Sequence, residues 1–292
     1  MMKNKDNRNH TNPSKRGTLK KLLMYVLLTV LALIFMFPLI WMVVCSFKDD
    51  TQIFSDIKSL KAFLPTFQSD VFFNYREVLQ KLPILRAMLN SVGYIAVIIA
   101  LGLVVNSMAG YAFARLKFPK KDLIFSLLLA VMIIPAQTVM LPQYSIIYNM
   151  GLSNTYLALI LPAIASPMYI FLFRQNFLGI PESIEEAAKL DGAGAFRTFF
   201  QVVMPLAKPT YATVALLVFI AYWNDFVWPV MVISDTSKQT IQMALSSLFS
   251  ITPVNYGHVM AGLTIVTVPV LILFLALQKY YVAGIASTGA KN

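Results

Sequence analysis

One carboxylate, that of Asp225, lies well inside a long apolar stretch of this sequence. A charged side chain near the centre of a bilayer costs about 2.5–3.5 kcal/mol on insertion scales, so we expect Asp225 to face a bundle interior or an aqueous cavity. Tyr222 and Asn224 add a ring face and hydrogen-bonding groups, and Pro229 would leave the carbonyl of Asp225 unpaired in a continuous helix. Polar groups of this kind at membrane depth are typical of a translocation path.

Other polar side chains in apolar stretches are Asn106, Thr264 and Thr267. Thr264 and Thr267 share one helix face because they are three residues apart. All of these groups, Asp225 included, could instead bond neighbouring helices and hold a bundle together. The sequence therefore offers six candidates for a path, with a structural role as the open alternative: Tyr222, Asn224, Asp225, Asn106, Thr264 and Thr267.

The most distinctive loop is IPESIEEAAKLDGAGAFRTFFQVVMPLAKP, residues 180–209. Pro181 is suited to open a helix, because its missing N–H costs nothing in the first turn. Ser183 and Glu186 have the spacing of a capping box, which is an alternative start. Gly192 is expected to end this helix in the left-handed conformation, and residues 195–204 form a second helical stretch.

Two helices this short are not stable alone in water, so each needs a surface to pack against. Ala187 and Ala188 present a small face that another backbone could approach closely, and Phe196, Phe199 and Phe200 present a larger apolar face. Spacing alone leaves two alternatives open. The loop either docks onto a partner protein or lies as an interfacial helix on the lipid headgroups.

Motifs for catalysis or for binding a cofactor are missing from the sequence. It contains no GxxxxGK[ST] loop for phosphates, and its only histidines are His10 and His258. Cys45 is the single cysteine and cannot form a disulfide within the chain. We therefore expect no catalytic residue, no metal site and no cofactor on this chain. If ATP drives its function, the ATPase must be another chain.

The elements that must position these residues are long apolar helices. The chain is 58% apolar and 13% charged, against about 25% charged in soluble domains, and its charges cluster between uncharged stretches. Helices are the default in lipid because they satisfy their own backbone groups. Gly102, Gly110 and Gly262 are expected to let helices approach closely. The sequence predicts an all-α, polytopic membrane protein with six transmembrane helices, over residues 22–45, 88–114, 123–140, 156–173, 211–233 and 259–277.

The distribution of basic residues predicts how these helices are oriented. Most Lys and Arg residues lie in the tail, in the 115–122 and 174–210 loops and at the C-terminus, so we expect both termini to be cytoplasmic. The same rule accounts for the net charge of +11 without a nucleic acid. The predicted organisation is a disordered tail (1–21), a membrane domain (22–283) with an external loop (46–87) and a cytoplasmic loop (177–209), and a C-terminal tail (284–292).

The segment EEAAKLDGAGAFRTFFQVVMPLAKP closely resembles the EAA motif of ABC importer permeases. NSVGYIAVIIALGLVVNSMAGYAFARLKFPKKD, RQNFLGIPESIEEAA, AYWNDFVWPVMVI and QKYYVAGIASTGAKN also resemble the carbohydrate (MalG-like) subfamily of these binding-protein-dependent systems. The resemblance covers essentially the whole chain after residue 20. The ending GIASTGAKN departs from the family form, which is closer to GLTAGAVKG.

This resemblance implies a MetI-like permease fold and a coupling role for the cytoplasmic loop. In the family, the loop forms the coupling helices that insert into clefts on the ATPase subunits. The implied coupling residues are Glu185, Glu186, Ala187, Ala188, Asp191, Gly192, Ala193 and Pro205. The implied partners are a second homologous permease, two cytoplasmic ATPase subunits that bind ATP and Mg²⁺, and an extracytoplasmic sugar-binding protein. The implied location is the bacterial cytoplasmic membrane.

Three alternatives to a sugar importer remain at this point. An ABC permease for a non-sugar solute keeps the class and changes only the cargo. An ion-coupled secondary transporter predicts inverted repeats and several ionisable groups inside the membrane, whereas this chain has one such group and no evident repeat. A membrane scaffold without transport would leave the EAA segment and Asp225 unexplained.

Overall fold

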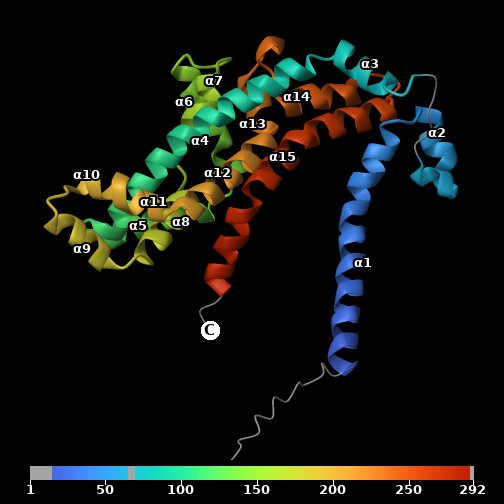
Figure 1. Cartoon of the computed structure of the whole chain (residues 1–292). Coiled ribbons are helices and arrows are strands. Elements are labelled where there is room, and N and C mark those ends of the chain that lie inside the picture. Colours follow the sequence, from blue (N-terminus) through green and yellow to red (C-terminus); the bar gives the residue numbers. More distant parts are fainter. Residues whose placement is uncertain (1–14, 65–69, 290–292) are drawn as a thin grey trace, which may run out of the picture.

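The computed structural model describes residues 15–64 and 70–289, and in these ranges every regular element is a helix (Figure 1). Three helices are long and apolar enough to cross a membrane alone: α1 (Lys15–Cys45), α4 (Ile84–Arg115) and α15 (Tyr256–Gly289). Three further apolar helical segments are bent by more than 40° at a short break, and each can supply one more span, which gives up to six. Six spans in the described part of the chain confirm the predicted all-α, six-span class.

The ends of the chain depart from the predicted boundaries. Helix α1 begins at Lys15, so it includes the last residues of the tail predicted over 1–21, and residues 1–14 lie outside the described part. Helix α15 continues to Gly289, within the tail predicted from residue 284, and residues 290–292 are likewise not described.

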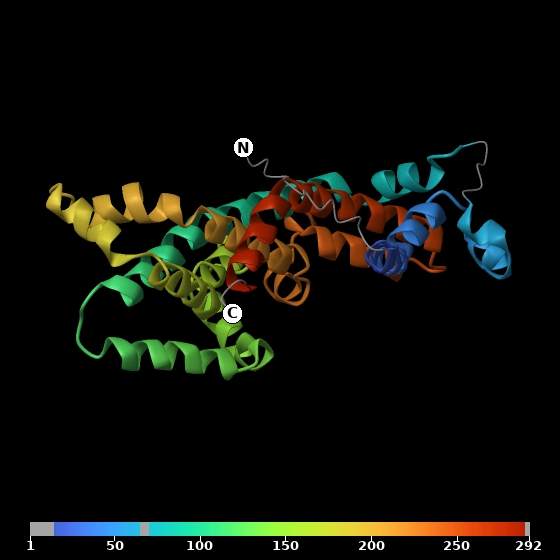
Figure 2. The same cartoon turned by 60° about the horizontal axis from the view of Figure 1, so that its bottom comes forward.

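The third and fourth predicted spans are not continuous helices. Helix α5 (Lys121–Ala130) continues into the short turn η3 (Val131–Ile133), and after Pro135 the chain turns by 102° into α6 (Ala136–Asn149). Proline ends the hydrogen-bonding ladder because it has no N–H, which is why the apolar run bends there. Figure 2 shows these green segments along one side of the bundle.

The fourth span bends at a second proline. Helix α7 (Tyr156–Ile160) and turn η4 (Leu161–Ala163) are followed by α8 (Pro167–Leu178), with a bend of 42° between the two parts. Pro167 is the first residue of α8, where its missing N–H is tolerated. Hydropathy alone showed an uninterrupted run in both spans, because the prolines that break the helices are themselves uncharged.

The fifth span differs most from its prediction. The expected helix over 211–233 is wrong, because α12 (Lys208–Trp223) ends before Asn224 and a separate short helix, α13 (Val227–Val232), follows. Asp225 therefore lies in a break between two helices rather than inside one. At its other end, α12 meets the preceding helical stretch, Ala195–Leu206, at 79°.

The bundle is built around the packing of α4 against α8, with α12 and α15 beside them (Figure 1). Gly110 makes this packing possible, since a Cβ there would lie 2.6 Å from Phe173 Cβ and 3.0 Å from the amide nitrogen of Arg174. A Cβ at Gly262 would meet Leu248 Cδ1 at 2.8 Å, and one at Gly102 would meet the Ile164 carbonyl at 3.3 Å. The predicted close approach at these three glycines is confirmed.

Replacement of Gly110 by Val is expected to separate α4 from α8. Overpacking of a tight contact costs about 1–3 kcal/mol, and here the obstacle is partly backbone, which cannot move aside easily. We expect a lower midpoint of thermal unfolding in detergent and less protein in the membrane. Gly93 is the matched control, because nothing lies within 4 Å of a Cβ built there. Equal losses for Gly93→Val and Gly110→Val would contradict the explanation.

Shorter helices occupy the connections on both sides of the bundle. On the side of the predicted external loops, Asn154 accepts hydrogen bonds at Oδ1 from the backbone of Ser234 (3.2 Å) and Asp235 (2.9 Å), which ties two loops together. The remaining elements are α2 (Asp50–Ser55), η1 (Asp56–Lys58), η2 (Leu60–Phe63), α3 (Phe73–Lys81), α9 (Glu182–Leu190), α10 (Ala195–Thr198), η5 (Phe199–Val203), α11 (Met204–Leu206), η6 (Thr236–Lys238), α14 (Ile241–Ser246) and η7 (Ser247–Ser250).

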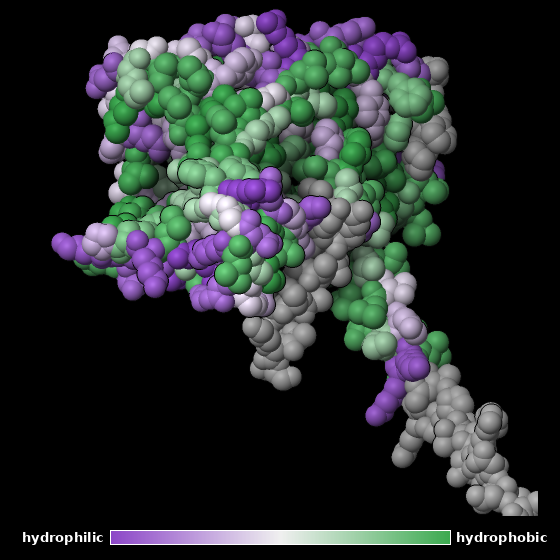
Figure 3. All heavy atoms as spheres, turned by 60° about the vertical axis from the view of Figure 1, so that its left-hand side comes forward, coloured by the Kyte–Doolittle hydropathy of each residue, from purple (hydrophilic) through white to green (hydrophobic). Residues whose placement is uncertain are grey.

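The surface carries a broad apolar band between two polar ends (Figure 3). The exposed side chains in this band include many Leu, Ile, Val and Phe residues of α1, α4 and α15. A soluble protein rarely exposes an apolar surface of this extent, whereas a lipid-facing surface requires it. The polar end seen at the front of the view lies on the side where Figure 1 shows α9 and α10.

Candidate functional site

The loop that carries the EAA-like segment projects from the bundle as two helical arms, α9 and α10, joined by a glycine turn (Figure 1). Helix α9 starts at Glu182 with Pro181 as its N-cap, and no side chain caps it, so the predicted capping box does not form. Gly192 has φ +77° and ends α9 in the left-handed region, as predicted. The second arm contains a π-helical turn, η5, which the sequence did not indicate.

The predicted coupling residues divide into two groups by exposure. Glu185 is buried, whereas Glu186, Ala187, Asp191, Gly192 and Pro205 are exposed and Ala188 and Ala193 are half-buried. Two large apolar side chains at the tips of the arms are also exposed, Leu190 at 90% and Phe196 at 71%. The loop therefore presents a polar-edged surface with two apolar protrusions, a form that suits insertion into a protein cleft.

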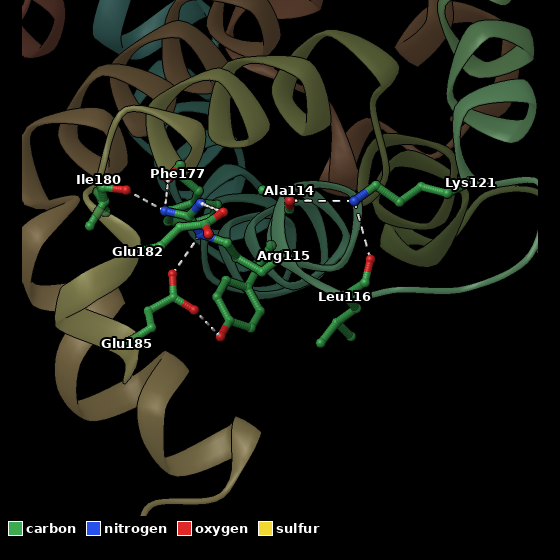
Figure 4. A network of polar contacts seen from close by, with 9 residues as sticks. Ala114, Arg115, Leu116, Lys121, Phe177, Ile180, Glu182 and Glu185 are labelled. Atoms are coloured by element: carbon green, nitrogen blue, oxygen red, sulfur yellow. Dashed lines mark hydrogen bonds and ion pairs between the residues drawn. The ribbon is translucent and has the colours of Figure 1, made fainter. Parts of the chain in front are cut away.

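Arg115, the last residue of α4, joins the loop to the membrane helices (Figure 4). Its Nε donates to Glu185 Oε1 at 2.6 Å and its Nη1 to Glu182 Oε1 at 3.3 Å, both on α9. Its Nη2 donates to the carbonyl of Phe177 at 2.7 Å and also to that of Ile180. One guanidinium thus holds the end of α8, the connection after it and α9 against the end of α4.

Tyr111, one turn before Arg115 on α4, bonds the same Glu185 carboxylate. Its hydroxyl donates to Glu185 Oε2 at 3.0 Å, so both oxygens of the buried carboxylate are bonded. Its ring lies 5.0 Å from that of Phe199 and 5.9 Å from that of Phe177, between centroids. Arginine is suited to such a position because its planar fork of donors is always charged. We call Arg115, Tyr111 and Glu185 the clamp.

Sequence reasoning missed Arg115 and Tyr111. A signal was present, because Arg115 is the first charge after a long apolar run and so falls at the membrane boundary next to the loop. Glu185 was predicted as part of the coupling surface, but its side chain is only 5% exposed and points inward to the clamp. The apolar surface predicted from Phe196, Phe199 and Phe200 is also divided, since Phe199 is buried.

The break before α13 holds a second group of predicted residues, Tyr222, Asn224 and Asp225. Two carbonyls at the end of α12 accept hydrogen bonds from side chains elsewhere in the chain. Tyr94 donates its hydroxyl to the Tyr222 carbonyl at 2.9 Å, and Gln242 donates its amide to the Trp223 carbonyl at 3.0 Å. Asp225 is half-buried and makes no ion pair with any described residue.

The other path candidates lie apart from this break and bond to backbone. Asn106 is buried and donates to the carbonyls of Gly102 (2.6 Å) and Ile164 (2.8 Å), and its Oδ1 accepts from the Ser166 amide at 2.8 Å. Thr264 and Thr267 each donate to the carbonyl four residues earlier on α15. Among the described residues, no hydrogen bond joins these three side chains to Asp225. Asn106 instead closes the bend between η4 and α8.

The described residues contain no group of three or more His, Cys, Asp or Glu side chains that could hold a metal ion. The arrangement brings together a projecting loop, a clamp that fixes it to a membrane helix, and a polar helix break inside the bundle. These features suit a protein that transmits movement to a pathway.

Comparison with solved structures places this arrangement in a known fold. The crystal structure of a bacterial ABC transporter involved in the import of the acidic polysaccharide alginate superposes with a TM-score of 0.79, covering 92% of this chain and 98% of that chain at 23% sequence identity. The described chain therefore has the fold of an ABC importer permease, the MetI-like fold predicted from the sequence.

Sequence comparison gives the family. The binding-protein-dependent transport system inner membrane component family matches residues 102–287, more than half of the chain. The chain belongs to this family and is a multi-pass membrane protein.

Curated relatives match over nearly their whole length. The arabinooligosaccharides transport system permease protein AraQ of Halalkalibacterium halodurans is 34% identical over 90% of this chain and 93% of its own. The lactose transport system permease protein LacG of Rhizobium radiobacter is 32% identical over 92% and 96%. The sn-glycerol-3-phosphate transport system permease protein UgpE of Yersinia pestis is 30% identical over 90% and 95%.

Proposed function

We propose that this chain is the permease subunit of an ATP-driven, binding-protein-dependent sugar importer in the bacterial cytoplasmic membrane, with both termini in the cytoplasm. It forms half of the translocation pathway with a second, homologous permease. Two cytoplasmic ATPase subunits, which bind ATP and Mg²⁺, dock on it through the loop of α9 and α10. An extracytoplasmic binding protein delivers the sugar, and the chain itself catalyses no reaction and holds no cofactor.

The observation that carries this proposal is the clamp between α4 and the projecting loop. A movement of α9, imposed by an ATPase subunit on Leu190, Phe196 and the exposed EAA residues, reaches α4 through Arg115 and Glu185. Helix α4 in turn packs against α8 and α12. The break at Asp225 lies at the end of α12, so the loop and the candidate path belong to one mechanically connected set of helices.

The proposed class of cargo rests on the names of the relatives. Two of the three relatives named above transport sugars by name, arabinooligosaccharides and lactose, and the third transports sn-glycerol-3-phosphate. We therefore propose a sugar or oligosaccharide, and the third relative supports a polyol phosphate as the second candidate. Tyr222, Asn224 and Asp225 are suited to contact such cargo, because an aromatic face and hydrogen-bonding groups recognise hydroxyl-rich solutes.

Copurification tests the proposal. The tagged chain is solubilised from its native membrane, and the chains and small molecules retained with it are identified by mass spectrometry. The proposal predicts an ATPase, a second permease and a solute-binding protein whose bound ligand is a sugar. A sugar phosphate or polyol phosphate in the binding protein would support the second candidate. Recovery of the chain alone, with uptake that continues without ATP, would contradict the proposal.

Asp225→Asn is expected to impair coupling rather than folding. No ion pair with a described residue holds this carboxylate, so its loss should change the midpoint of thermal unfolding little. A lost charge-assisted contact worth about 1.4 kcal/mol would lower substrate-stimulated ATPase activity about tenfold. Asn106→Ala is the contrasting variant, because it leaves the Ile164 carbonyl and the Ser166 amide without their partner and should lower the unfolding midpoint. Reduced stability with normal stimulation for Asp225→Asn would contradict a path role.

A further inference from the structure

An exposed apolar segment with the sequence IKSLKAFL, residues 57–64, lies outside the bundle near the Cys45 end of α1. Ile57 is 58% exposed, Leu60 83% and Leu64 61%. Its two charged residues, Lys58 and Lys61, are both exposed and both positive. Exposed apolar side chains with lysines and no acidic residue are typical of segments that lie in a membrane interface.

The segment folds back along α1 toward the membrane. The ring of Phe63 lies 5.9 Å from that of Phe37 and 5.7 Å from that of Trp41, both on α1. Phe37 and Trp41 are about 12 Å and about 6 Å from the Cys45 end of α1, at 1.5 Å rise per residue. In Figure 1 the blue chain after α2 lies beside the end of α1, as these ring contacts require.

The depth of these contacts follows from the length of α1. Its uncharged apolar part, residues 22–45, spans about 36 Å, roughly 6 Å more than the hydrocarbon core of a bilayer. With the excess shared between the two ends, Trp41 lies near the hydrocarbon boundary and Phe37 lies inside it. The segment packed against both rings is therefore at the level of the headgroups and the first carbons of the acyl chains.

Lys48 fixes the segment in this position. It is buried, and its Nζ donates to Asp56 Oδ2 at 3.1 Å and to the carbonyls of Lys61 at 2.7 Å and Ala62 at 3.3 Å. All three donors of the ammonium group are used, so its charge is paired and its hydrogen bonds are satisfied. These bonds fix the backbone between Leu60 and Leu64, so the exposed positions of both leucine side chains follow from the fold of the segment.

We propose that residues 57–64 form an interfacial membrane anchor, with Ile57, Leu60 and Leu64 in the lipid leaflet at the Cys45 end of α1. The surface is continuous with α1, whose residues 20–40 are all exposed. Lys58 and Lys61 reach the headgroups by extending their charged ends, and their charge favours anionic lipids. The anchor fixes the tilt of α1 independently of what the complex transports.

A spin label at residue 60 tests this placement. Cys45, the only cysteine, is replaced by Ala, and Leu60→Cys is labelled in the full complex reconstituted into vesicles of phosphatidylethanolamine and phosphatidylglycerol. Collision rates with oxygen, which enters lipid, and with a water-soluble nickel chelate are compared. Leu33→Cys on α1 is the lipid reference, and Gln80→Cys on α3 is the aqueous reference.

The proposal predicts an oxygen-to-nickel ratio at residue 60 shifted from the Gln80 value toward the Leu33 value. It further predicts that raising the phosphatidylglycerol content increases this shift, and that Lys58→Glu with Lys61→Glu removes the increase. A ratio equal to that at Gln80 would place the segment in water. Low collision rates with both reagents would show that another protein chain covers it. Either of these results overturns the anchor.

Discussion

Arg115→Ala is expected to abolish ATP-driven uptake. The substitution removes the four hydrogen bonds that tie α9, the end of α8 and the connection between them to α4. It leaves the Glu185 carboxylate buried with only Tyr111 as partner among the described residues. Loss of one partner of a buried ion pair costs about 3–5 kcal/mol. We expect the loop to detach from α4, so that ATPase subunits still hydrolyse ATP but the membrane helices no longer follow.

The measurement is uptake per ATP hydrolysed in proteoliposomes, together with the amount of ATPase that copurifies. The double variant Arg115→Ala with Glu185→Gln removes the unpaired charge, so it should recover thermal stability while uptake per ATP stays low. Arg174→Ala is the matched control, since that arginine bonds the Phe113 carbonyl and stacks on Phe125 but makes no hydrogen bond or ion pair with the described residues of α9 and α10. Recovery of normal coupling in the double variant would show that the clamp serves folding alone.

Gly192→Val is expected to abolish uptake while leaving the protein in the membrane. Gly192 has φ +77°, and a β-branched residue in that region costs about 1–3 kcal/mol. Nothing lies within 4 Å of a Cβ built at this position, so the packing of the chain itself does not suffer. The strain instead turns the α9–α10 connection away from the geometry that an ATPase cleft accepts. Uptake, membrane content and copurified ATPase are measured together.

Two further variants separate backbone strain from surface contact at this turn. Gly192→Asn keeps a residue that tolerates the left-handed region, so it should retain substantially more uptake than Gly192→Val. Gly151→Val introduces the same strain at φ +68° in a loop at the other end of the bundle, and its Cβ also meets nothing. Equal loss of uptake for Gly151→Val and Gly192→Val would contradict a specific role for the coupling turn.

The sequence was sufficient for the class of fold, because the charges are confined to short segments between apolar runs. It was not sufficient for the shape of the helices. Pro135 and Pro167 lie at the two bends, but the size of a bend depends on what packs around it, as Asn106 does at the second bend. At the break after Trp223 the nearest proline is Pro229, in α13, and the carbonyls of Tyr222 and Trp223 accept bonds from Tyr94 and Gln242 in distant parts of the chain.

In the candidate site, features set by residues close in sequence could be predicted, whereas features set by residues far apart in sequence could not. The left-handed turn at Gly192 was predicted because glycine, helix end and preceding polar residue are neighbours in sequence. The clamp could not be predicted this way, because Arg115 and Glu185 are 70 residues apart and only packing brings them together. Lys48 and its partners around residue 61 are nearer in sequence, yet only the fold shows that the ammonium group is buried.

Cross-linking from Leu190 is the most direct test of whether the loop of α9 and α10 contacts an ATPase subunit. Leu190→Cys, in a background where Ala replaces Cys45, is labelled with a photoactivated cross-linker in native membranes, and Tyr148→Cys at the end of α6 serves as the control. The account predicts a product between this chain and an ATPase subunit from residue 190, with a yield that changes when ATP is added, and no such product from residue 148. Products with lipid alone from residue 190 would contradict the claim that this loop couples the permease to an ATPase.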